Sequence, residues 1–330
     1  MTSLPKKIET PLTLMLEIDY PIIMAPMFLV SSPKMIIEAL NSGITAAFPA
    51  LNYRTDKELR DAIDEIKSKT DKPFGINLIV NKSNLKFEQQ LDICIEKKVD
   101  FIITSLGSPE KAIRRCKNHG IKVFCDVVDV KYAKKVEKLG ADAIIAVTSE
   151  AGGHAGNLTA KELLPQIKKE CNIPVIAAGG VTRGKDLKTM LDLGAAGVSA
   201  GTVFIASEEC GVSKEYKEAI LQYSGKDIVL TENLSGTPLT VINTPYVQKT
   251  GTKAGWFTKL LLKNKNLKKW VKLFVAAKGM KAIQKAAFGA TYKTFWVAGP
   301  AIEHIHEIRP VKKIIEDIVS EYGKLAEGQK

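Results

Sequence analysis

The sequence predicts a parallel (β/α)8 TIM barrel of the α/β class, with a helical subdomain inserted before the last barrel helix. The first observation is a series of eight short apolar runs that recur about every 25 residues through the first 210 positions. These runs do not alternate with polar residues, as expected for strands buried on both faces. The predicted strands are 21–25, 44–48, 74–78, 101–104, 122–125, 143–147, 174–177 and 197–200.

The second observation is that helical spacing and a stop signal separate the runs. Residues 57–66, for example, place apolar side chains three and four apart. Several such segments end in a glycine just before the next run, as helices in repeated β-α units do; these glycines are Gly43, Gly120, Gly140 and Gly194. A doubly wound open sheet is the alternative, but the first unit lacks the Gly-x-Gly-x-x-Gly signature of a dinucleotide-binding fold.

The repeat breaks after Thr202. Residues 207–300 show no clear strand pattern, whereas 256–262, 267–277 and 280–288 read as helices. The segment 310–322 is amphipathic and is predicted to be the eighth barrel helix. We therefore expect a barrel built from residues 1–210 and 301–330, with a lysine-rich helical subdomain at 211–300 that covers the active site.

The net charge of +12 belongs to one segment. Residues 249–293 hold 12 lysines and no acid, so the remainder of the chain sums to zero. A solvated face of a helical cap is the favoured interpretation, and a basic surface that associates weakly with an anionic membrane stays open. Lysine without arginine argues against reading of a DNA sequence, so no nucleic-acid partner is expected.

Compartment is indicated by what the sequence lacks. No secretory signal and no run of 18 apolar residues occur. The five cysteines are scattered, with no CxxC pair, and the histidines lack metal-ligand spacing. We expect a cytoplasmic protein with reduced thiols, no metal and no transmembrane segment, and a homodimer stays open.

Glycine-rich loops follow the seventh and eighth predicted strands, where barrels usually hold phosphate. Bare amides in such loops can turn toward an anion, and a threonine adds a hydroxyl donor. Tight turns without a ligand are the alternative. The candidates for binding a phosphorylated cofactor or substrate are Gly179, Gly180, Ser199, Ala200, Gly201 and Thr202.

Other strand ends carry further candidates. His154 follows Gly152 and Gly153 after the sixth strand, and its ordinary pKa suits a general acid or base. Ala25, Pro26 and Met27 end the first strand, where a soft side chain can line a flat ring; ordinary core packing is the alternative.

The middle strands hold polar residues. Asn77 puts an amide inside an apolar strand, where it must find partners, either a ligand or a structural network. Ser105 and Asp126 end the fourth and fifth strands and are weaker candidates.

These motifs resemble the nitronate monooxygenase family, also called the 2-nitropropane dioxygenase family, of FMN-dependent barrels. The specific match is 150–156, Glu-Ala-Gly-Gly-His-Ala-Gly, supported by 25–27, 77–78, 177–181 and 201–202. The resemblance implies FMN as cofactor and alkyl nitronates, oxidised with O2, as substrates. It implies that 25–27 and Asn77 lie near the flavin, with the phosphate on Gly180, Gly201 and Thr202. It makes His154 the catalytic base.

Three departures from the family pattern bear on the substrate. Val147 stands where members often carry Gln or Glu, Val203 replaces an arginine, and Phe28 and Leu29 replace glycines. Flavin-type enoyl-acyl-carrier-protein reductases and NADH:quinone reductases share the fold and stay open as alternatives. They imply an enoyl or quinone substrate and NAD(P)H as electron donor.

Overall fold

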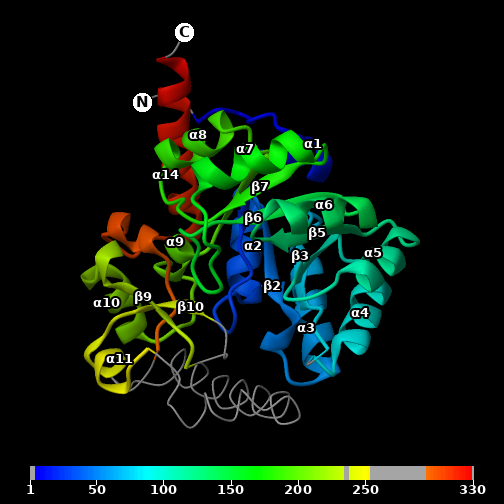
Figure 1. Ribbon diagram of the computed structural model, residues 1–330, viewed down its shortest axis with the longest axis horizontal. Helices are drawn as coiled ribbons and strands as arrows, with labels where there is room; N and C mark the ends of the chain where they lie inside the picture. The colour runs from blue at the N-terminus through cyan, green and yellow to red at the C-terminus, as the bar shows by residue number, and fades with distance from the viewer. Residues whose placement is uncertain (1–3, 83, 234–237, 253–294, 329–330) are drawn as a thin grey trace.

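The strands of the barrel follow one another around the ring in chain order, and every neighbouring pair is parallel (Figure 1). The computed structural model describes residues 4–82, 84–233, 238–252 and 295–328. The predicted (β/α)8 barrel is confirmed, with strand ends within two residues of the predicted ones. The strands are β1 (Ile22–Met24), β2 (Thr45–Pro49), β3 (Gly75–Ile79), β4 (Phe101–Ser105), β5 (Lys122–Val127), β6 (Ala143–Val147), β7 (Val175–Ala178) and β8 (Gly197–Ala200).

Helices surround the barrel because each turns one apolar face toward the strands. In α3, Thr55 caps the first turn through the Glu58 amide, and Leu59, Ile63 and Ile66 are buried. The glycine stops that the sequence predicts occur in the left-handed region, for example Gly140 at φ +91°. The ring helices are α2 (Pro33–Asn41), α3 (Asp56–Lys67), α4 (Phe87–Glu96), α5 (Glu110–Lys117), α6 (Val130–Leu139), α7 (Ala160–Glu170) and α8 (Gly184–Asp192).

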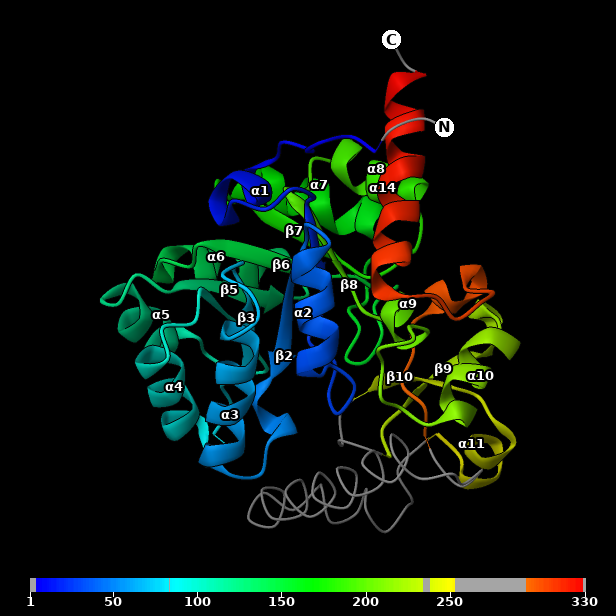
Figure 2. The ribbon, with the colours of Figure 1, turned by 180° about the vertical axis from the view of Figure 1, so that it is seen from behind.

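The predicted last barrel helix is α14 (Val311–Glu327), which packs against α8 and α2 and completes the ring (Figures 1 and 2). Contact with α8 is close, because a Cβ on Gly184 would lie 2.2 Å from the amide nitrogen of Tyr322. The Gly184 amide also donates to the Glu321 carboxylate at 2.8 Å.

One end of the barrel is closed by packing. The short helix α1 (Pro11–Leu16) places Leu12 and Leu16 in the interior cluster. Above them the rings of Phe101 and Phe124 stack at 4.8 Å, and Gly75 makes room for Phe101. Because the amino-terminal end is filled, a ligand site belongs at the carboxyl ends of the strands.

The segment after β8 contains strands that the sequence pattern did not reveal. Two four-residue strands, β9 (Ile228–Thr231) and β10 (Leu239–Ile242), form an antiparallel pair. The expectation of no strands in 207–300 is therefore wrong, because such short apolar runs cannot be assigned by periodicity. The other elements that the structure describes between β8 and the last barrel helix are α9 (Thr202–Ile205), α10 (Lys214–Gln222), η2 (Gly225–Asp227), α11 (Pro245–Thr250) and η3 (Pro300–His304).

The three helices predicted for 256–262, 267–277 and 280–288 lie outside the described residues. The boundaries of the subdomain at 211 and 300 stay predictions. Among the helices that the structure describes, none has the length and apolar character needed to cross a membrane.

Candidate functional site

A cavity of about 1040 Å³ opens at the carboxyl ends of the barrel strands. Its lining comes from β3, from the loops after β1, β4, β5, β6, β7 and β8, and from the β9–β10 pair. Every candidate cofactor or catalytic residue from the sequence lines this one cavity: Ala25, Pro26, Met27, Asn77, Gly152, His154, Gly179, Gly180, Ser199, Ala200, Gly201 and Thr202. Ser105 and Asp126 line it as well.

The loop after β7 is shaped by close packing on the histidine loop. Gly179 has φ +111°, and a Cβ there would lie 2.4 Å from the Ala151 amide nitrogen. A Cβ on Gly180, at φ +75°, would lie 3.2 Å from a carboxylate oxygen of Glu150. Packing alone therefore requires Gly179, and the nearby Glu150 carboxylate makes Gly180 a less favourable anion contact than Gly201.

Hydrogen-bond donors suited to an anion lie on the loop after β7 and on the loop after β8. Within the described part of the chain, the amides of Gly180 and Gly201 donate no hydrogen bond. The Thr202 hydroxyl accepts from the Gly299 amide at 3.0 Å, so its own hydrogen stays available to a ligand. Two open amides and one hydroxyl can thus bind a phosphate.

The loop after β1 forms the neighbouring wall. Ser31 fixes it, accepting from the Met27 amide at 2.9 Å and donating to the Ala25 carbonyl at 3.3 Å. A Cβ on Gly201 would lie 3.3 Å from the Met27 sulfur. An apolar thioether therefore lies directly beside the open Gly201 amide, an arrangement that suits a flat ring carrying a phosphate chain.

The histidine loop is held from the inserted segment. The Gly153 amide donates to the Thr240 hydroxyl at 2.8 Å, and the Thr240 amide donates to the Gly153 carbonyl at 2.8 Å. Thr240 belongs to β10, 87 residues away in sequence, so no local pattern could identify it. This two-bond bridge fixes the backbone that carries the next residue, His154.

His154 faces the open part of the cavity. Its residue surface is exposed, yet the surrounding protein removes enough water to lower the pKa of the imidazole. A neutral imidazole at neutral pH can accept a proton.

A chain of polar side chains crosses the tops of β3, β4 and β5. Asn77 Nδ2 donates to Ser105 Oγ at 2.7 Å and to the Ile103 carbonyl at 3.2 Å. Ser105 Oγ donates to Asp126 Oδ2 at 2.5 Å. Burial raises the pKa of Asp126 to about 6. The structural network that the sequence left open for Asn77 thus exists, and it reaches a titratable carboxyl group.

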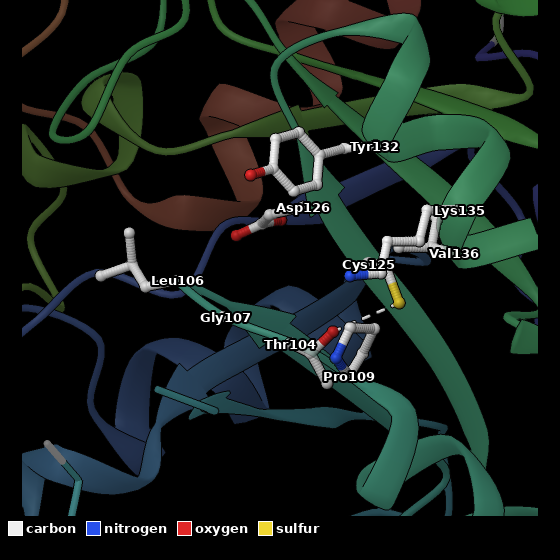
Figure 3. A pocket seen from close by; sticks show the side chains of 9 residues that line it. All are labelled: Thr104, Leu106, Gly107, Pro109, Cys125, Asp126, Tyr132, Lys135 and Val136. Carbon is white, nitrogen blue, oxygen red and sulfur yellow. Dashed lines mark hydrogen bonds between the residues drawn. The ribbon is translucent and has the colours of Figure 1, made fainter. Parts of the chain in front are cut away.

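A small pocket of about 20 Å³ lies behind Asp126, between β4, β5 and α6 (Figure 3). It has room for roughly one water molecule. Cys125 lies in its wall, where Thr104 Oγ1 donates to the sulfur at 3.2 Å. Burial raises the pKa of the Cys125 thiol to about 12, so the sulfur is a packing atom rather than a nucleophile.

The chain is similar to known proteins over most of its length. The family model described as nitronate monooxygenase matches residues 9–321. The "Probable nitronate monooxygenase" of Staphylococcus saprophyticus is 31% identical over 74% of this chain and 81% of its own length. FabK from Thermotoga maritima superposes with a TM-score of 0.86 at 33% identity, covering 98% of this chain and 99% of its own.

One further relative has a different described activity. It is the (3aS,4S,5R,7aS)-5-hydroxy-7a-methyl-1-oxo-octahydro-1H-indene-4-carboxyl-CoA dehydrogenase of Rhodococcus jostii. Its sequence is 28% identical over 95% of this chain and 96% of its own length. The relatives of this chain are therefore named for more than one activity.

Proposed function

The chain belongs to the nitronate monooxygenase family of oxidoreductases, and from that premise we propose that it is an FMN-dependent nitronate monooxygenase with His154 as base. Membership of the family implies a flavin and a small-molecule substrate. FMN, the nitronate and the base are our proposal. The observation that carries it is a single cavity lined both by open glycine amides and by a histidine with a lowered pKa.

The residues present fit an FMN. The Gly180 and Gly201 amides and the Thr202 hydroxyl are donors for its phosphate, with Gly201 the more favourable of the two glycines. Met27 and the backbone of Ala25 and Pro26 would lie along the ring. When bound, the flavin supplies the redox chemistry that amino-acid side chains lack.

The chain's own contribution is proton handling. A nitroalkane carries an acidic hydrogen on the carbon next to its nitro group, and neutral His154 can accept that proton to give the nitronate. The Gly153–Thr240 bridge holds the loop while this happens, because positioning decides the rate of such a transfer. A preformed nitronate lacks the proton and does not need the base.

That difference supplies the test. In His154→Ala we expect turnover of a neutral nitroalkane to fall about a hundredfold or more, within the usual range for general-base catalysis. Turnover of the preformed nitronate, and bound flavin, should be retained. The matched control is His119→Ala, an exposed histidine at the end of α5 whose ring contacts the Arg115 carbonyl. Unchanged nitroalkane turnover in His154→Ala would refute the base role.

A second candidate is a flavin reductase of the enoyl-thioester or quinone type that uses NAD(P)H. Two observations favour keeping it. The cavity extends past the glycine rim along apolar residues of the inserted segment, more than a small nitronate needs; these are Leu230, Pro238, Leu239, Phe295 and Val297. One full-length relative is named for a carboxyl-CoA substrate. Rapid anaerobic bleaching of the flavin by NADH would favour this candidate. A cytoplasmic location and a homodimer stay predictions.

A further inference from the structure

Asp126, Ser105 and Asn77 form one layer at the top of the barrel interior. Phe124 and Ile103, two residues before Asp126 and Ser105, belong to the interior cluster, so these polar side chains point to the same side. Register places the three strands side by side, with Asn77 opposite Ile103 and Thr104 opposite Cys125. A carboxyl group, a hydroxyl and an amide therefore meet at the floor of the cavity.

Charge at this floor comes from β5 and not from β6. Val147 occupies a position on β6 where members of the nitronate monooxygenase family often carry Gln or Glu. Its side chain packs against the interior cluster. Asp126 lies on the adjacent strand, paired with Ile145. The floor thus keeps a polar group, supplied from a neighbouring position.

The hydrogen bonds in this layer run in one donor-to-acceptor direction, from Asn77 through Ser105 to Asp126. Both hydrogens of the Asn77 amide are used, one by the Ile103 carbonyl and one by Ser105 Oγ. Ser105 gives its only hydrogen to Asp126. An ionised Asp126 can only accept, so it holds Ser105 as acceptor toward Asn77. The Asn77 carbonyl oxygen is then left for the cavity that Asn77 lines.

We propose that Asp126 is a positioning residue that acts through Ser105 to keep the Asn77 carbonyl oxygen toward the bound ligand. At the floor of the cavity, the Asn77 carbonyl oxygen then accepts a hydrogen bond from an N–H or O–H of the ligand. A flavin carries both kinds of donor, in its ring imide and its ribityl chain. The inference rests on the proposed function in taking that ligand to be FMN.

Protonation of Asp126 reverses the constraint. A neutral carboxyl group can donate to Ser105, which frees the serine hydroxyl to donate to a flipped Asn77 and turns an N–H2 toward the ligand. Because the pKa of Asp126 is raised to about 6, this change falls near neutral pH. Titratable neighbours are Cys125, Tyr132 and Lys135 around the small pocket (Figure 3), with Glu150 and His154 on the same cavity.

The test is the dissociation constant of FMN, measured by spectral titration of the apoprotein between about pH 5 and pH 8. In the unmodified protein we expect affinity to fall about tenfold as the pH drops through about 6. In Asp126→Asn this step should vanish, and binding at the upper pH should be about tenfold weaker. Asp142→Asn is the control, because it removes a carboxylate that accepts from the Val123 amide outside the cavity.

Ser105→Ala breaks the same chain without touching the carboxyl group and should also abolish the step. If Asp126→Asn does not fold, the pH dependence of FMN binding in Ser105→Ala tests the proposal instead. A step that persists in either folded variant belongs to another group, such as His154, and overturns the assignment of Asp126. An unmodified protein that binds no FMN overturns the proposed function and this inference together.

Discussion

Replacing Thr240 by valine tests how the inserted segment serves the histidine loop. The change keeps the shape of a side chain that is 4% exposed and removes the hydroxyl that accepts from the Gly153 amide at 2.8 Å. The backbone bond from Thr240 to Gly153 can remain. A part-buried amide left without its partner costs about 1–3 kcal/mol, so the thermal midpoint should fall by roughly 2 °C for each kcal/mol lost.

Turnover of a neutral nitroalkane should fall as well. The loop that carries His154 loses one of its two anchors to β10, and a small misplacement of a base costs on the order of a hundredfold in rate. Thermal unfolding and kcat for a neutral nitroalkane are the assays. Thr240→Ser keeps the acceptor oxygen and should behave as the unmodified protein. A valine variant with unchanged midpoint and kcat would refute the view that this bridge positions the histidine.

Two further predictions follow from the cavity. Gly180→Asp should abolish FMN binding, because its Cβ would lie 3.2 Å from Glu150 and its carboxylate would repel both Glu150 and a phosphate; a fully yellow variant would contradict the phosphate site. Asp126 binds its proton more tightly in the folded apoprotein than in the unfolded chain, so stability should decrease as pH rises from about 4 to about 6. Urea unfolding measures the loss of unfolding free energy between about pH 4 and pH 6. In Asp126→Asn this loss should be smaller by an amount on the order of 2 kcal/mol. An equal loss in both proteins would show that Asp126 does not titrate there.

Local signals explain why the barrel could be predicted from the sequence. A buried apolar run such as 143–147 or 197–200 is continuous, and a stop such as Gly194 lies three residues before the next strand begins. Glycine loops and the histidine motif are also local, so the candidate residues could be assigned to one rim. The structure then places them on one cavity.

Contacts between distant segments explain what was missed. Thr240 meets Gly153 across 87 residues, and the pairing of β9 with β10 has no periodic signature. The hydrogen bond between Ser105 and Asp126 depends on the register of β4 against β5, which cannot be predicted from the sequence pattern. The sequence predicts that Gly179 belongs to an anion-binding loop, and the structure adds that its conformation also depends on close packing against the backbone of Ala151, which no sequence pattern reveals.

The most direct measurement is the visible spectrum of the purified protein after incubation with FMN, recorded under argon before and after addition of an alkyl nitronate or NADH. We expect a bound flavin that the nitronate bleaches and NADH does not. Bleaching by NADH alone would move the assignment to the reductase candidate. A protein that is colourless once unbound FMN has been removed would contradict the claim that this cavity holds a flavin.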